Sequence, residues 1–144
     1  MISWYTICMK ENLIHYRTCV CNINYHMVWS VKYRRKILSA EVEAYLQELV
    51  QEIAEDKGFT VHLFECEEGD HVHCFVSAPP KLSITAIMKY LKGISGRKLF
   101  ERFPEIRNQL WKGELWNHSY YVETVGSVSE ENIRRYIEHQ SKAY

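Results

Sequence analysis

An alternation of apolar and other residues near the start of the chain limits the fold most strongly. Every second position is apolar at Ile23, Tyr25, Met27, Trp29 and Val31. Successive side chains of a β-strand point to opposite faces, so this period of two predicts a strand roughly over residues 19–33. The chain is therefore expected to build a sheet whose two faces differ in character.

Two later segments have the spacing of amphipathic helices. Ser39 can cap a first helix, and Gly58 fits its end. The apolar face of this helix comprises Val42, Leu46, Leu49, Val50 and Ile53. Ser83 can cap a second helix, although Gly93 and Gly96 weaken it and indicate a bend or a close backbone approach. Its apolar face comprises Ile84, Ile87, Met88, Leu91 and Ile94.

The remaining elements complete an α+β pattern. Residues 59–66 and 71–78 predict two strands, and the acidic turn Glu67-Glu68-Gly69-Asp70 between them predicts an antiparallel hairpin. Residues 119–125 predict a fourth strand, and Ser127 with Glu130 fits the capping box of a last helix. This order predicts a ferredoxin-like (RRM-like) β-α-β-β-α-β antiparallel sheet with helices on one face, plus a C-terminal helix. The other face would then be free for function or for a partner.

The length of 144 residues fits one domain. We expect residues 1–15 to form an N-terminal extension and residues 16–144 a single domain. No apolar stretch is long enough to span a bilayer, so no membrane partner is expected. The five cysteines are odd in number and include no CxxC pair. They favour a reducing cytoplasm over a disulfide framework or a zinc knuckle.

The segment His71-Val72-His73 is the sharpest chemical feature. Residues two apart in a strand lie on the same side, so both imidazoles are expected on one face, with Cβ atoms about 6–7 Å apart. Val72, Cys74 and Val76 take the other face and suit a helix-covered core. A metal site is one interpretation, and a surface pair of histidines with satisfied polar atoms is the other.

The last predicted helix carries Ile133, Tyr136, Ile137 and Gln140 on one face. Apolar helical faces are usually packing faces, so the pattern alone favours Tyr136 as a core aromatic residue. Gln140 is harder to explain by packing, because a buried amide is unfavourable. Its carbonyl oxygen could face a cation, and the four-residue spacing would let the tyrosine hydroxyl meet the same ion.

Charge is clustered although the net charge is zero. A neutral total argues against a nonspecific nucleic-acid coat, but it can hide a basic surface. The basic groups are Lys32, Arg34, Arg35 and Lys36, then Lys89, Lys92, Arg97 and Lys98, then Arg134 with Arg135. They are either a solvated surface or a contact for a nucleic-acid backbone, with a base stacked on a residue such as Tyr33.

Together these motifs resemble the single-tyrosine HUH transposases of small bacterial and archaeal insertion sequences, which move as single-stranded DNA. HUH denotes histidine, hydrophobe, histidine, and residues 71–73 match it. The other matching segments, in the same order, are Asn24-Tyr25-His26-Met27-Val28-Trp29, Lys32-Tyr33-Arg34-Arg35-Lys36, Tyr90-Leu91-Lys92-Gly93, Tyr120-Tyr121-Val122-Glu123-Thr124-Val125-Gly126, and the helix with Tyr136 and Gln140. The resemblance covers roughly Tyr16 to the C-terminus.

The resemblance implies a metal-dependent enzyme that cleaves and rejoins single-stranded DNA at insertion-sequence ends. It implies that His71, His73 and Gln140 bind Mg²⁺ or Mn²⁺, and that Tyr136 is the nucleophile of a 5′-phosphotyrosine intermediate. The implied partners are single-stranded DNA with subterminal hairpins and a second copy of the chain, with composite active sites and no small-molecule substrate. We expect DNA contacts at the basic residues Lys32, Arg34, Arg35, Lys36, Lys92 and Arg97.

Two alternatives stay open at this point. A host-serving relative that processes repeated extragenic palindromes would use the same chemistry, and only the flanking genomic DNA separates the two. A non-enzymatic nucleic-acid-binding module would stack bases on exposed aromatic residues of the sheet. The strand at residues 71–78 offers only Phe75 for that purpose beside the histidines.

Overall fold

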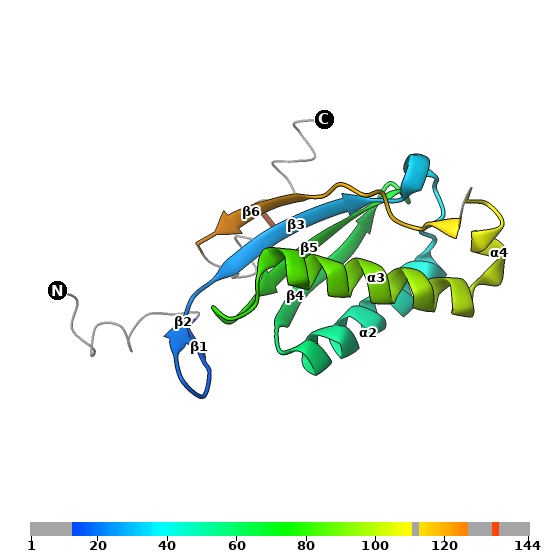
Figure 1. Cartoon of the computed structure of the whole chain (residues 1–144). Coiled ribbons are helices and arrows are strands. Elements are labelled where there is room, and N and C mark those ends of the chain that lie inside the picture. Colours follow the sequence, from blue (N-terminus) through cyan, green and yellow to red (C-terminus); the bar gives the residue numbers. More distant parts are fainter. Residues whose placement is uncertain (1–12, 111–112, 127–133, 136–144) are drawn as a thin grey trace.

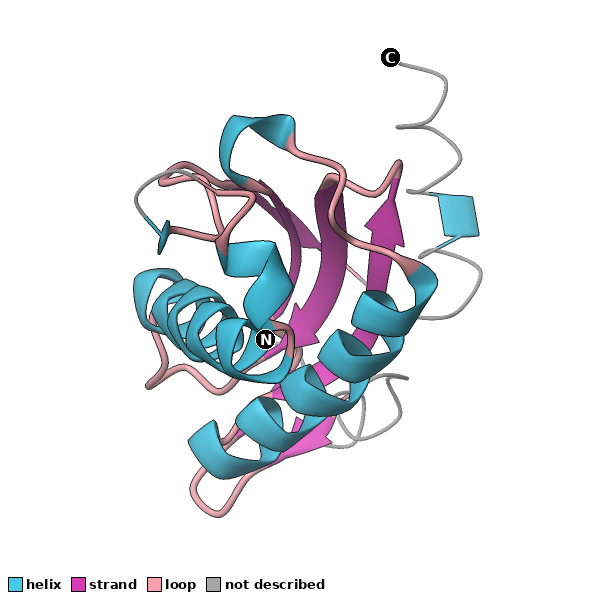
Figure 2. Cartoon of the chain, turned by 90° about the vertical axis from the view of Figure 1, so that its right-hand side faces the viewer, coloured by secondary structure: helices cyan, strands magenta, loops and turns pink. Residues whose placement is uncertain are grey.

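The protein folds into a four-stranded antiparallel sheet with two long helices on one side. The computed structural model describes residues 13–110, 113–126 and 134–135. The sheet has the order β4-β5-β3-β6 and consists of β3 (Asn24–Ser30), β4 (Thr60–Glu67), β5 (His71–Ser77) and β6 (Tyr121–Val125). Helices α2 (Ala40–Lys57) and α3 (Ile84–Arg102) lie on the same side of the strands (Figures 1 and 2). This arrangement confirms the predicted ferredoxin-like fold. The predicted C-terminal helix with Tyr136 and Gln140 lies outside the described residues.

The first predicted strand is wrong at both ends. Its beginning is a separate strand, β2 (Val20–Cys21), which pairs with β1 (Ile14–His15) in a small sheet of its own. Its end is replaced by the 3₁₀ turn η1 (Lys32–Arg34), because the backbone of Tyr33 and Arg34 is left-handed, with φ of 60° and 53°. β1 contains the last two residues of the expected extension, and the division into residues 1–15 and 16–144 stays a prediction.

The predicted caps of the two long helices are confirmed, whereas the predicted capping box of Ser127 and Glu130 lies outside the described residues. Val42 N–H donates to Ser39 Oγ at 3.3 Å, and Gly58 ends α2 in the left-handed conformation with φ of 84°. Ala86 N–H donates to Ser83 Oγ at 3.0 Å at the start of α3. Among the described residues, no helix combines the length and the apolar composition that a bilayer crossing requires.

Helix α3 runs without interruption through both of its glycines. A Cβ atom on Gly96 would lie 3.7 Å from the Trp116 side chain, so the close approach indicated by the sequence is real there. Nothing lies within 4 Å of the corresponding position on Gly93. A short helix, α4 (Pro104–Arg107), follows and begins at Pro104, where a missing N–H does no harm.

The core lies between the two helices and one sheet face. Met27, Trp29, Val72 and Cys74 are buried on this face together with the apolar faces of α2 and α3. Trp29 packs edge-on against Trp116, with ring centroids 5.9 Å apart. Each such side chain contributes about 1.5–3 kcal/mol on burial, so this face supplies most of the driving force for folding.

The opposite sheet face is not free at its centre, contrary to expectation. His26 and Phe75 are fully buried, and His73 is 4% exposed. The rings stack on one another, His26 on Phe75 at 4.5 Å and His26 on His73 at 5.3 Å between centroids. Tyr121, on the edge strand β6, remains half exposed. The centre of this face is therefore an ordered stack of rings and not an open platform.

Candidate functional site

The hairpin of β4 and β5 brings the histidine pair together with a carboxylate. Its loop is tight, because Glu68 and Gly69 both have positive φ, and Asp70 N–H donates to the Glu67 carbonyl at 3.3 Å. Glu67 consequently lies directly opposite His71 in the strand register. The alternation along β5 then places His73 on the same face as His71, as predicted.

Three ligand atoms converge at this point. Glu67 Oε2 lies 2.7 Å from His73 Nε2 and 3.2 Å from His71 Nε2. Each of the three side chains offers a ligand atom within 4.8 Å of the other two, so the group could hold a metal ion. Glu68, Asp70 and His71 form a second such group at the loop. The described residues thus contain groups of the kind that bind divalent cations.

The Nδ1 atom of His71, on the side of the ring away from Glu67, contacts the hairpin loop. His71 Nδ1 lies 2.7 Å from Asp70 Oδ1, and the other oxygen of Asp70 accepts from Arg34 Nε at 3.3 Å. Burial opposes the ionised form of Asp70, but hydrogen bonds from His71 and Arg34 outweigh it and lower the pKa of this carboxyl. An ionised Asp70 accepts the Nδ1 proton of His71 and leaves Nε2 toward Glu67.

The Nδ1 atom of His73, on the side of the ring away from Glu67, contacts a residue in the middle of the sheet. His73 Nδ1 lies 3.0 Å from His26 Nε2, and His26 Nδ1 lies 3.2 Å from Glu123 Oε1. Burial lowers the pKa of His73, helped by the neighbouring His26 and opposed by Glu67. Burial also lowers the pKa of His26, against the opposing effect of Glu123. Both rings are thereby held neutral, which is the form in which an imidazole binds a metal.

The structure thus brings together His71 and His73 and adds residues that the sequence did not single out. Glu67 was hinted at by the acidic turn, since a tight hairpin places its flanking residues opposite the next strand. His26 was hinted at by its position in the alternation, on the side away from the core. Its contact with His73 depends on the register between β3 and β5, for which the sequence carried no signal.

The basic residues expected to bind DNA differ in their exposure and in their partners. Arg34, Arg35 and Lys36 are exposed beside Tyr33, which is 58% exposed. Arg34 also pairs with Asp70, and Lys32 and Lys92 are engaged within the protein. Lys32 Nζ lies 2.9 Å from Glu114 Oε2. Lys92 Nζ donates to the backbone oxygens of Asn117 and Ser119, and burial lowers its pKa.

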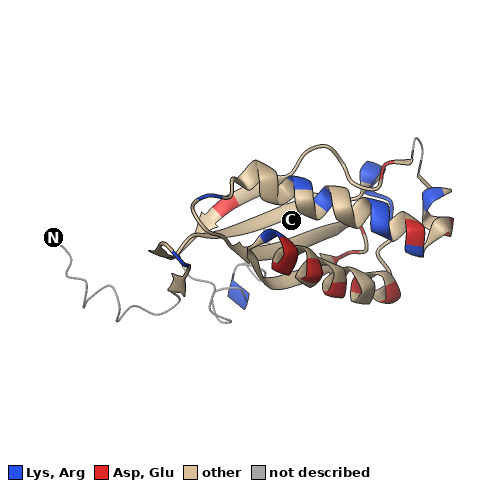
Figure 3. Cartoon of the chain, turned by 60° about the horizontal axis from the view of Figure 1, so that its bottom comes forward, with Lys and Arg blue, Asp and Glu red and all other residues tan. Residues whose placement is uncertain are grey.

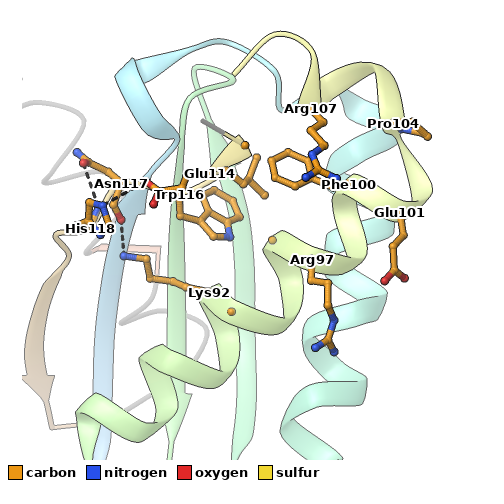
Figure 4. A pocket seen from close by; sticks show the side chains of 14 residues that line it. Lys92, Arg97, Phe100, Glu101, Pro104, Arg107, Glu114, Trp116, Asn117 and His118 are labelled. Atoms are coloured by element: carbon orange, nitrogen blue, oxygen red, sulfur yellow. Dashed lines mark hydrogen bonds and ion pairs between the residues drawn. The ribbon is translucent and has the colours of Figure 1, made fainter. Parts of the chain in front are cut away.

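A pocket of about 740 Å³ lies between α3 and the segment 113–118 (Figure 4). Lys92, Arg97 and Arg107 line it, and Arg107 lies over the Phe100 ring at 6.0 Å. All but one of the charged residues of α3 are basic, whereas all but one of those of α2 are acidic (Figure 3). The neutral net charge therefore conceals separate basic and acidic surfaces.

Comparisons with known proteins identify the family of this chain. Residues 19–140 match the family described as Transposase IS200 like. The ISDra2 transposase TnpA of Deinococcus radiodurans is 40% identical over 124 residues, which cover 86% of this chain and 88% of that protein. The transposase for insertion sequence element IS200 of Salmonella typhimurium is 34% identical over 131 residues, covering 91% and 83%.

Solved structures extend the similarity to three dimensions. A crystal structure of a Deinococcus radiodurans protein described as a transposase has a TM-score of 0.72 and 36% identity, covering 88% of this chain and 97% of that one. A REP-associated tyrosine transposase bound to a REP hairpin has a TM-score of 0.54 and 12% identity, covering 85% and 67%, and supports the fold alone. The relatives support an enzymatic role in DNA processing. This chain belongs to the family of IS200-like transposases.

Proposed function

We propose that this transposase cuts and rejoins single-stranded DNA through a tyrosine and a divalent metal centre. One observation carries the proposal: the Nε2 atoms of His71 and His73 approach the same oxygen of Glu67, at 3.2 and 2.7 Å. Their Nδ1 atoms are meanwhile held by Asp70 and His26. Two imidazole lone pairs beside a carboxylate form a donor set for a divalent cation.

The residues present fit Mg²⁺ or Mn²⁺. His73 is held neutral by burial, and Glu67 supplies the hard oxygen ligand that these ions prefer. Gln140 would add its amide oxygen as a further ligand. A bound ion would polarise the scissile phosphate and offset the charge on its oxygens.

Tyr136 is the proposed nucleophile. Its phenolic oxygen attacks phosphorus, the bond from phosphorus to the 3′-oxygen breaks, and the leaving 3′-oxygen takes up a proton. The tyrosine then carries the 5′-phosphate of the DNA. When a 3′-hydroxyl attacks this phosphotyrosine, the bond to the tyrosine oxygen breaks and the strand is rejoined, so no ATP is required.

Single-stranded DNA with hairpins is the proposed substrate, in keeping with the REP hairpin bound by the tyrosine transposase of the same fold. The pocket beside α3 offers Arg97 and Arg107 for phosphates. The exposed Tyr33, flanked by Arg34 and Arg35, offers a ring on which a base can stack. These contacts would hold the strand while the metal centre acts.

A homodimer with composite active sites is the proposed assembly. Coexpression of a Tyr136→Phe chain with a His73→Ala chain tests it. If the tyrosine of one chain serves the histidines of the other, the mixture regains cleavage although each chain alone is inactive. A mixture as inactive as its components would show that each chain uses its own tyrosine.

The relatives support one of the alternative functions, and the flanking genomic DNA would separate a mobile element from a host-serving relative. The proteins at 40% and 34% identity are transposases of insertion sequences, which favours a mobile element over a host-serving relative. A non-enzymatic module that stacks bases on the sheet is disfavoured, because Phe75 is fully buried under the neighbouring rings.

The proposed function is tested with single-stranded DNA from the ends of the native element and Mg²⁺, followed by a denaturing gel. The wild type is expected to give a slowly migrating covalent protein–DNA adduct, and Tyr136→Phe none. Tyr45→Phe is the control, because Tyr45 lies on α2 and its hydroxyl donates to the Lys98 carbonyl on α3. An adduct formed by Tyr136→Phe would show that the nucleophile is assigned wrongly.

A further inference from the structure

A line of polar side chains crosses the whole sheet beside the histidine pair. It runs from Glu67 through His73 and His26 to Glu123, with successive distances of 2.7, 3.0 and 3.2 Å. Its members come from β4, β5, β3 and β6, which is the spatial order of the strands. The line therefore connects the candidate metal ligands to the opposite edge of the sheet.

The number of protons sets the direction of these hydrogen bonds. A neutral imidazole carries a single N–H. If His73 turns its Nε2 lone pair toward a cation beside Glu67, its proton lies on Nδ1 and is donated to His26 Nε2. His26 then carries its own proton on Nδ1 and donates it to Glu123, whose carboxylate accepts.

Without a metal the two directions compete, because the first turns the Nε2 lone pair of His73 toward Glu67 Oε2, 2.7 Å away, and only a cation at Glu67 removes that contact. The reverse direction places the same kind of contact at Glu123. If His73 carried its proton on Nε2, His26 would donate from Nε2 and turn an Nδ1 lone pair toward Glu123 Oε1, 3.2 Å away. A lone pair facing a carboxylate at a buried ring is unfavourable, because neither atom supplies a proton. Glu123 consequently favours the arrangement in which Nε2 of His73 is available to a metal.

We propose that His26 and Glu123 are positioning residues that fix the ring orientation and proton position of His73 for metal binding. The inference rests on the proposed metal centre and names the residues that prepare it. The ring plane of His26 is fixed by stacking on Phe75, with 10° between the planes. Glu123 is fixed by the Tyr121 hydroxyl, which donates to its second oxygen at 3.1 Å. Partners of this kind change metal affinity by about 10- to 100-fold.

Mn²⁺ titration of the full chain tests the positioning role. Glu123→Ala is expected to weaken Mn²⁺ binding by about 10-fold or more. Glu123→Gln is expected to recover part of the affinity, since its amide oxygen still accepts from His26. Glu65→Gln is the matched control: Glu65 lies on β4 directly opposite His73 but outside the line. The Mn²⁺ affinity of Glu65→Gln should stay within about threefold of the wild-type affinity, because the substitution removes only a screened charge.

Nitrogen NMR of the histidine rings separates positioning from a general loss of structure. In the metal-free proteins, Glu123→Ala should have a larger fraction of His26 and His73 with the proton on Nε2 than the wild type, because Glu123 no longer accepts from His26 Nδ1. Wild-type Mn²⁺ affinity in Glu123→Ala would overturn the inference and leave the metal centre intact. Failure of the wild type to bind Mn²⁺ would overturn the metal centre and the positioning role with it.

Discussion

The two faces of the sheet are equally buried at their centres but are held together by different interactions. On the helix-covered face, Met27, Val72 and Cys74 pack among apolar side chains. On the other face, His26 and His73 are stacked rings whose nitrogens all have polar contacts. Along the same strands, one position therefore packs in the apolar core and the next belongs to the histidine site. A substitution at one position should change stability, and a substitution at the next should change activity.

The largest effect is expected from His73→Ala. Loss of this ligand should lower the yield of covalent DNA adduct by at least about 100-fold, since changes in the residues around a metal ligand already cost about 10- to 100-fold. Circular dichroism should show that the variant is still folded. Adduct formation at the wild-type rate would mean that the histidine face does not carry the chemistry.

Met27→Ala, on the neighbouring strand and the opposite face, is expected to lower stability and leave metal binding unchanged. Removing this fully buried side chain should lower the free energy of unfolding by about 2–5 kcal/mol, measured by urea denaturation. Mn²⁺ affinity of the folded fraction should be unchanged. A variant with normal stability and weak metal binding would break the division between the two faces.

The pH dependence of stability should follow the histidines whose pKa values are lowered by burial. Burial lowers the pKa of His62, whose Nε2 lies 2.6 Å from Ser77 Oγ. Below about pH 6.5 the unfolded chain therefore takes up a proton that the folded chain does not. Stability should be full above this pH and fall on acidification, by well under about 1.4 kcal/mol per pH unit, because His62 is partly exposed and solvent screens its charge.

His62→Gln should make this loss of stability shallower. The measurement is urea denaturation of the metal-free protein at about pH 7.5 and about pH 5.5, on either side of the ordinary histidine pKa. His26 and His73, which also have lowered pKa values, would retain part of the dependence. An identical pH dependence in His62→Gln and the wild type would show that His62 is protonated equally in both states.

The smallest effect is expected outside both faces, at the pocket beside α3. Arg97→Ala should weaken single-stranded DNA binding a few-fold and reduce the salt dependence by about one phosphate contact. Lys98→Ala is the control, since Lys98 is exposed on the same helix but does not line the pocket. Equal losses in the two variants would indicate a diffuse basic surface instead of a defined contact.

Local signals in the sequence predicted much of the fold. Caps at Ser39 and Ser83 and the alternation around Met27 each depend on neighbouring residues, and the structure has all of them. The strand end at Ser30 was missed, because it depends on left-handed backbone at Tyr33 and Arg34, residue types that seldom adopt it.

For the site too, local features could be predicted from the sequence, and contacts between distant strands could not. The pairing of His71 with His73 follows from alternation within one strand. The contacts of His26 and Glu123 follow from the register between strands far apart in the chain, which tertiary packing sets. Tyr136 and Gln140 lie outside the described residues and remain predictions based on the family resemblance.

Binding of Mn²⁺ to the metal-free protein, followed by electron paramagnetic resonance, tests the central claim most directly. The comparison is between the wild type and the double variant His71→Ala/His73→Ala, with folding checked by circular dichroism. The wild type is predicted to bind one ion per chain, and the folded double variant to bind at least about 100-fold more weakly. Equal affinity in the two proteins would contradict a metal centre on the histidine face.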